Sequence, residues 1–123
     1  MSDRVRLFVY GTLMSGEPNA QVMAGSSFIG KVATAAAYRL VELSEYPGLL
    51  AGGKTSVKGE LYLVDDQLLS ALDGVEGCPA LFQRGEIELQ GGERAQAYLG
   101  ADPSFDNAPA IPGGDWRKHR SER

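Results

Sequence analysis

Glycine is the feature of this sequence that most limits how the chain can fold. The 123 residues include 16 glycines, spread from Gly11 to Gly114. Glycine adopts positive φ at little cost and lets the backbone approach another group closely. So many glycines in a chain of this length indicate numerous turns, as in a small β-rich protein or one whose backbone lies against a ligand.

Short β-prone segments lie between these glycines. Residues 6–10 (RLFVY) end at Gly11, which predicts a first strand that runs into a sharp loop. Residues 28–43 lack a clean helical stripe, so we expect one long or bent strand there. Tyr46 and Pro47 indicate a turn before a short apolar segment. Further strands are expected at residues 57–64, 81–89 and 94–98, the last two joined by a hairpin loop at residues 90–93.

Residues 65–74 (DDQLLSALDG) give the one clear helix signal. Either aspartate can cap the first turn, the leucines at 68, 69 and 72 form one apolar face, and Gly74 or Gly77 can end the helix. A second, short helix is expected at residues 20–23, between Pro18 and Gly25.

These elements together predict an α+β fold, because the helices are segregated from mostly antiparallel strands. A sheet of short strands hides its edges best when it curls, so we expect a small mixed β-barrel of about five to seven strands with one or two short flanking helices. No shift in composition marks a boundary, which predicts a single domain over residues 1–123. Residues 101–123 are expected to form an irregular C-terminal extension, since prolines interrupt residues 101–114 and little periodicity remains.

The charge distribution argues against a nucleic-acid partner. Residues 1–115 carry 8 Lys and Arg against 15 Asp and Glu, whereas residues 116–123 carry 4 against 1. A nucleic-acid groove needs a basic stripe to neutralise phosphates. We interpret the basic tail as a solvated or fraying terminus rather than a binding arm.

The chain has a single cysteine, Cys78, and a single histidine, His119. This composition excludes an intrachain disulfide and a Cys- or His-based metal site, so any metal would have to be bound by carboxylates alone. The N-terminus lacks the apolar core of a secretory signal, and no apolar run approaches the roughly 18 residues of a membrane helix. We therefore expect a cytoplasmic protein without a membrane partner.

The loop after the first expected strand is a candidate anion site. Residues 10–16 (YGTLMSG) follow a strand end, where successive backbone N–H groups can form a nest for a carboxylate or an oxyanion. The sequence is neither a Walker loop nor GxGxxG. An ordinary glycine turn is the alternative interpretation.

Glu76 is the candidate acid or base. It lies between Gly74 and Gly77, just beyond the expected end of a helix, where the helix dipole and partial burial would both raise its pKa. Such a carboxylate suits proton transfer near neutral pH, although a solvated loop residue is the alternative. We interpret Cys78 as a packed thiol. Arg84 could pair with a substrate carboxylate or with Glu86 on its own strand, and we favour the structural ion pair.

Two segments together resemble the γ-glutamyl cyclotransferase-like family. Residues 8–13 (FVYGTL) and 16–19 (GEPN) are similar to its N-terminal signature, and residues 72–84 (LDGVEGCPALFQR) resemble the second signature of its γ-glutamylamine cyclotransferase branch. Residues 46–47 (YP) and 57–65 (VKGELYLVD) lie between them in the expected order, and residues 114–116 (GDW) resemble the tail of small bacterial members. The resemblance covers roughly residues 6–99. One departure is Phe82, which stands where relatives have Tyr, so the leaving group stays open.

The resemblance implies a small mixed β-barrel with a pocket at one end, and neither a metal nor an organic cofactor. It implies that the carboxylate of Glu76 is the catalytic acid/base. The residues expected to contact the substrate, in part through backbone groups, are Tyr10, Gly11, Thr12, Leu13, Tyr46 and Phe82.

The implied reaction is an attack of the substrate's own α-amine on its γ-carbonyl, which forms 5-oxoproline and releases an amine. Because nucleophile and electrophile belong to one molecule, no enzyme nucleophile is needed. The expected partner is a small γ-glutamyl-amine such as γ-glutamyl-lysine, bound by a monomer or weak dimer. The same ring closure on γ-glutamyl-amino acids or on a γ-glutamyl-protected metabolite is an alternative. A non-catalytic module that binds a small carboxylate is another.

Overall fold

The computed structural model describes residues 4–43 and 45–122, and within them the chain forms seven strands, two α-helices and two 3₁₀-helices. The strands are β1 (Val5–Val9), β2 (Ser27–Ala33), β3 (Tyr38–Leu43), β4 (Tyr46–Ala51), β5 (Lys58–Val64), β6 (Phe82–Glu88) and β7 (Arg94–Gly100). The helices are η1 (Ala20–Met23), α1 (Asp66–Val75), η2 (Pro103–Asn107) and α2 (Trp116–Ser121).

All seven strands belong to one mixed sheet. Its order is β2-β5-β1-β7-β4-β3, with β6 paired to β7 off this path. The pairs β1–β7 and β4–β7 are parallel, and the other neighbours are antiparallel. The predicted α+β class and strand number are confirmed, but β2 and β3 end the path, so the sheet of the described residues is not a closed barrel.

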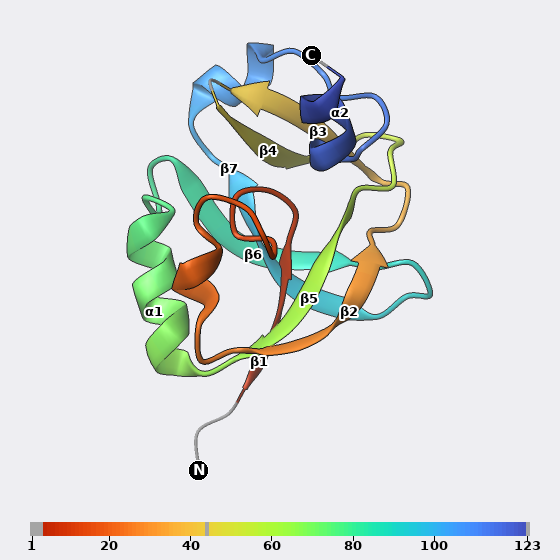
Figure 1. Ribbon diagram of the computed structural model, residues 1–123. Coiled ribbons are helices and arrows are strands. Elements are labelled where there is room, and N and C mark those ends of the chain that lie inside the picture. Colours follow the sequence, from red (N-terminus) through yellow and green to blue (C-terminus); the bar gives the residue numbers. More distant parts are fainter. Residues whose placement is uncertain (1–3, 44, 123) are drawn as a thin grey trace.

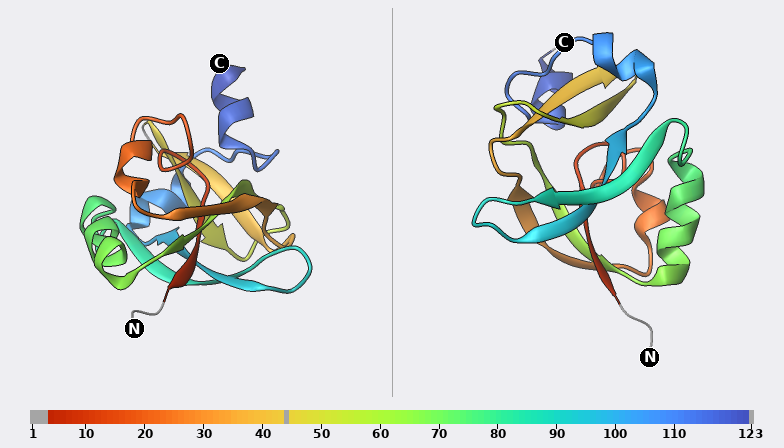
Figure 2. Two further views of the ribbon diagram at one scale, coloured as in Figure 1. Left: turned by 60° about the horizontal axis from the view of Figure 1, so that its bottom comes forward. Right: turned by 180° about the vertical axis from the view of Figure 1, so that it is seen from behind.

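The elements divide between two parts of the molecule. The β3–β4 hairpin, η2 and α2 lie together at one end, whereas α1 and η1 lie beside the remaining strands (Figure 1). The loop between β6 and β7 lies on the side away from α1 (Figure 2). The candidate site lies where these parts meet, because residues of both line one cavity.

The prediction of one strand over residues 28–43 is wrong. β2 pairs with β5, whereas β3 pairs with β4, so residues 34–37 separate two strands at opposite ends of the sheet path. The buried Thr34 marks the break: its hydroxyl accepts a hydrogen bond from the Val57 N–H at 2.9 Å and donates to the Ala35 carbonyl at 2.8 Å. The turn expected at Tyr46 is also wrong, because Tyr46 is the first residue of β4 and pairs with Leu43.

Helix α1 is confirmed, together with both of its ends. Asp65 is the N-cap, and its carboxylate accepts from the Leu68 N–H at 2.8 Å. At the other end, Gly77 has φ +67° and donates to the Gly74 carbonyl, while the Cys78 N–H donates to the Asp73 carbonyl at 3.0 Å. This is the Schellman arrangement of a helix C-terminus, and it makes the preceding residue, Glu76, the C-cap.

The C-terminal segment is more regular than expected. Its first part contains η2, capped by Asp102, and residues 116–121 form α2, capped by Asp115. Trp116 is buried and holds α2 on the body of the protein, since a buried indole removes a large apolar surface from water. The interpretation of the tail as a solvated or fraying end is therefore wrong.

No helix in the described part of the chain is long and apolar enough to cross a membrane. The cytoplasmic location, the extent of the domain and the oligomeric state stay predictions.

Candidate active site

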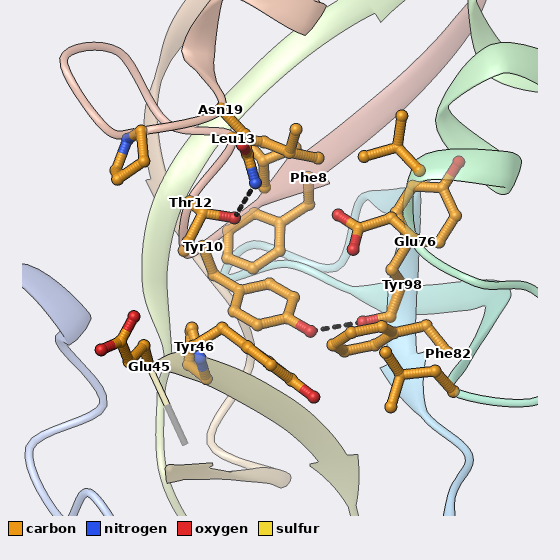
Figure 3. A pocket seen from close by; sticks show the side chains of 16 residues that line it. Phe8, Tyr10, Thr12, Leu13, Asn19, Glu45, Tyr46, Glu76, Phe82 and Tyr98 are labelled. Atoms are coloured by element: carbon orange, nitrogen blue, oxygen red, sulfur yellow. Dashed lines mark hydrogen bonds between the residues drawn. The ribbon is translucent and has the colours of Figure 1, made fainter. Parts of the chain in front are cut away.

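A cavity of about 320 Å³ lies at the meeting point of five elements. Its lining comes from the end of β1 and the loop that follows, the start of β4, the end of α1, the start of β6 and the middle of β7 (Figure 3). All seven residues that the sequence nominated line it. They are Tyr10, Gly11, Thr12, Leu13, Tyr46, Glu76 and Phe82.

The loop after β1 presents its backbone to this cavity. The Met14 N–H donates to the Gly11 carbonyl, and Asn19 donates to Thr12 twice, from its N–H to the carbonyl at 2.9 Å and from Nδ2 to Oγ1 at 3.2 Å. The N–H groups of Gly11, Thr12 and Leu13 donate to no acceptor among the described residues. Three successive N–H groups without protein acceptors at a cavity wall can receive an anion.

Gly11 is required by a close contact rather than by its φ angle. A Cβ atom at this position would lie 2.6 Å from Cγ of Pro47 on β4. The loop and β4 therefore approach each other as only a glycine allows.

Tyr10 holds the loop in place through its hydroxyl group. This buried hydroxyl donates to the Tyr98 carbonyl at 2.5 Å and accepts from the Leu49 N–H at 3.1 Å. Burial, with the nearby charge of Glu76, raises the pKa of Tyr10 far above its usual value. The side chain is therefore a neutral link between β1, β4 and β7, and its hydroxyl is occupied by protein partners.

Glu76 points its carboxylate into the cavity, toward the side on which Thr12 and Leu13 lie (Figure 3). The carboxylate accepts no hydrogen bond from any described residue. Burial raises its pKa from 4.5 to about 7. The predicted direction is thus correct, and burial is its cause. Near neutral pH such a group both accepts and donates a proton readily.

A polar network supports the helix end that carries Glu76. Asp73, one turn earlier on α1, accepts from the Tyr98 hydroxyl at 2.7 Å and forms a two-point ion pair with Arg84 at 3.0 and 3.2 Å. Burial opposes ionisation of Asp73, but the hydrogen bonds from Arg84 and Tyr98 outweigh it and lower its pKa. Arg84 therefore forms a structural ion pair, as expected, although its partner is Asp73 rather than Glu86.

Aromatic rings form another part of the cavity wall. Tyr46 and Phe82 lie 6.0 Å apart between ring centres, and Phe82 packs on the buried Phe105 at 5.2 Å. Phe82 itself is 5% exposed, so it shapes the cavity from within the core.

Among the lining residues that the sequence did not nominate, three carry polar side chains: Asn19, Glu45 and Tyr98. Asn19 and Glu45 lie close in the sequence to nominated residues, and this proximity could have pointed to them. Tyr98 comes to the site only through the pairing of β7 with β1, which local sequence does not reveal.

The described residues contain no group of three or more His, Cys, Asp or Glu side chains placed to hold a metal ion. Cys78 lies close to Glu76 in the sequence, but burial, with the nearby Asp73 charge, raises the pKa of its thiol. The thiol therefore lacks the activation that a nucleophilic cysteine needs.

Comparisons with known proteins agree on one family. The family model described as gamma-glutamyl cyclotransferase, AIG2-like, matches residues 7–118. A Vibrio cholerae protein provisionally named gamma-glutamylcyclotransferase is 39% identical over 110 residues, which are 89% of this chain and 93% of that protein. The gamma-glutamylaminecyclotransferase of Rattus norvegicus is 41% identical in an alignment of 93 positions that covers 68% of this chain and 62% of the rat protein.

The fold comparison gives the same answer. The crystal structure of an AIG2-like protein from Mus musculus superposes with a TM-score of 0.77 at 33% identity, over 89% of this chain and 86% of the mouse chain. The family match spans both the loop after β1 and the end of α1, the two segments that face each other across the cavity. The chain thus belongs to the gamma-glutamyl cyclotransferase, AIG2-like family.

Proposed function

We propose that this protein converts a γ-glutamyl-amine into 5-oxoproline and a free amine. The observation that carries the proposal is the carboxylate of Glu76, with a pKa of about 7 and no protein partner among the described residues, which faces a loop with three unused N–H groups across one cavity. The names of the Vibrio and rat relatives point in the same direction.

The reaction needs a proton carrier and no enzyme nucleophile. The substrate's α-nitrogen forms a bond to its γ-carbonyl carbon, and the bond from that carbon to the leaving nitrogen breaks. The α-ammonium nitrogen loses two protons as it becomes the lactam N–H, and the leaving nitrogen gains two as it departs as an ammonium. Glu76 as a carboxylate takes the first proton from the α-ammonium and then, as an acid, delivers it to the leaving nitrogen. The second proton leaves the ring nitrogen after the attack and follows the same route. The enzyme ends each cycle in the protonation state in which it began. Folding the substrate so that its two ends meet supplies much of the acceleration.

The loop after β1 would hold the substrate's negative charge. No Lys, Arg or His is found among the described residues that line the cavity, so a substrate carboxylate must be neutralised by backbone donors. The N–H groups of Gly11, Thr12 and Leu13 are those donors. Fixed donors in a partly dry cavity contribute a few kcal/mol each when charge develops on an oxygen.

The charges of the cavity favour a leaving amine whose nitrogen is far from any carboxylate over the α-amine of an amino acid. In a γ-glutamyl-α-amino acid, a second carboxylate lies two bonds from the scissile nitrogen, next to the position that Glu76 must reach. No cation of the described lining offsets that repulsion. In ε-linked γ-glutamyl-lysine the second carboxylate lies several carbons away, and Glu45, across the cavity from Glu76, can receive the cationic end (Figure 3).

The test is 5-oxoproline formation from γ-glutamyl-ε-lysine, γ-glutamyl-alanine and glutathione, with Glu76→Gln as the matched variant. We expect product from γ-glutamyl-ε-lysine, less from the other two, and a loss of roughly 10²- to 10⁴-fold in kcat for the variant. Calorimetry with 5-oxoproline should show that the variant still binds. No product from any substrate, with 5-oxoproline binding retained, would favour a carboxylate-binding module instead.

A further inference from the structure

Helix α2 contacts the loop after β1 at residues that do not line the cavity. Arg117 donates to the Ser15 carbonyl, and its Nε lies 3.3 Å from Oε2 of Glu17. Arg120 donates to the same Oε2 at 3.2 Å and also pairs with Oε1. Neither Ser15 nor Glu17 belongs to the cavity lining, whereas Gly11, only four residues before Ser15, does.

The contacts involve two carboxylates that are almost completely buried. The side chains of Glu17 and Glu60 are 5% and 3% exposed. Glu60, on β5, accepts from the Ser15 N–H at 2.8 Å and from Ser15 Oγ at 2.7 Å, and Arg117 lies 3.7 Å away. Burial would raise the pKa of Glu60, but the donors from Ser15 and Tyr62, together with the Arg117 charge, outweigh it and lower the pKa.

Attaching a terminal helix through buried charges carries a large desolvation penalty. Removing one partner of such a pair leaves a carboxylate without compensation, and this cost is much larger than that of losing an exposed pair. Trp116 alone would supply apolar anchoring for α2. The arginines add a fixed geometry instead, because a planar guanidinium holds several acceptors in one plane.

Ser15 is connected to the N–H groups of residues 11–13 through two hydrogen-bonded turns. The Glu17 N–H donates to the Met14 carbonyl, and the Met14 N–H donates to the Gly11 carbonyl, so two consecutive turns link the clamped segment to the cavity wall. A shift of Ser15 therefore displaces the N–H groups of residues 11–13.

We infer that Arg117 is a positioning residue, which acts through Ser15 and Glu60 to set the N–H groups of residues 11–13 for the substrate carboxylate. The inference rests on the proposed function for its effect on catalysis. Arg120 supports it from the outer side through Glu17 alone. The basic tail thus supports the substrate site, although none of its described residues, 116–122, lines the cavity.

The test compares Arg117→Ala, Arg117→Lys and Arg120→Ala in the full chain. The matched control is Arg94→Ala, which removes an arginine from an exposed pair with Glu86 on β6. Two readouts are needed: kcat and KM for γ-glutamyl-ε-lysine over a range of pH, and hydrogen exchange without ligand at the hydrogen-bonded backbone amides of Met14, Ser15 and Glu17.

For Arg117→Ala we expect KM to rise roughly 10- to 100-fold, since small misplacements of a binding group have effects of that order. The pH midpoint of kcat should stay unchanged, because Glu76 is not touched. Amide exchange at Met14, Ser15 and Glu17 should become faster, Arg117→Lys should recover part of both effects, and Arg120→Ala should be milder. A merely unfolded fraction would lower kcat and leave KM unaltered.

Unchanged amide exchange in Arg117→Ala would overturn the inference, and so would faster exchange with an unchanged KM. If the wild-type chain forms no 5-oxoproline, the proposed function fails alone. In that case the exchange data, with calorimetric binding of 5-oxoproline in place of KM, still decide whether Arg117 positions the loop.

Discussion

Replacing Glu76 by Gln should remove turnover and stabilise the fold at the same time. The pKa of Glu76 is 4.5 in an unfolded chain and about 7 in the folded protein, because burial disfavours the charged carboxylate. A raised carboxylate pKa means that stability is complete below pH 4.5 and is lost as pH rises toward 7. The difference between the two values corresponds to about 3 kcal/mol at pH 8. Gln has nearly the same shape and no charge, so Glu76→Gln escapes this loss.

Urea unfolding of both proteins at pH 5 and pH 8 measures the effect. The variant should gain about 2 kcal/mol over the wild type between these two pH values, because part of the loss is already present at pH 5. Glu45→Gln, which removes an exposed carboxylate of the same cavity, is the control and should show no such gain. A stability difference that does not change with pH would refute the assignment of a buried, ionisable Glu76. A variant less stable than the wild type at pH 8 would refute it as well.

Three further outcomes are expected. Gly11→Ala places a Cβ atom 2.6 Å from the ring of Pro47, so it should cost about 1 to 3 kcal/mol in urea unfolding and weaken 5-oxoproline binding, whereas Gly30→Ala, with open space around it, should change stability by less than about 0.5 kcal/mol. The kcat/KM for γ-glutamyl-ε-lysine should fall about tenfold per pH unit below a midpoint near 7, where Glu76 is protonated and cannot accept a proton; a flat profile would exclude it as the base. Glu45→Lys should lower kcat/KM for substrates with a cationic leaving group and raise it for γ-glutamyl-alanine; equal changes for both would contradict a role in leaving-group selection.

The elements that the sequence predicts well are those with local signals. Helix α1 has an N-cap, an apolar face and a glycine with positive φ, and each of these acts within a few residues. The break between β2 and β3 has no such signal. It depends on a hydrogen bond between Thr34 and Val57, which are 23 positions apart, and the alanines around it neither favour nor forbid a strand.

The same distinction separates the predicted half of the site from the rest. The loop after β1 and the glutamate after α1 are recognisable because each is a short segment with glycines beside it. The groups that hold them are far away in the sequence: Tyr10 bonds to Tyr98 across 88 positions, and Arg117 bonds to Glu17 across 100. Local sequence therefore identifies residues that line the cavity, whereas the sheet and the tail supply the groups that hold them.

This division follows from the chemistry of the proposed reaction. When the nucleophile belongs to the substrate, the protein contributes a bent binding geometry and one proton carrier, so its precision must lie in backbone atoms rather than in an activated side chain. A side-chain substitution does not change the chemistry of a backbone N–H donor; it can only change where that donor lies. The loop after β1 is accordingly held from two sides. The Tyr10 hydroxyl bonds to β4 and β7, and arginines of α2 contact Ser15 and Glu17. Variants on either side should therefore alter substrate binding before they alter the proton transfer by Glu76.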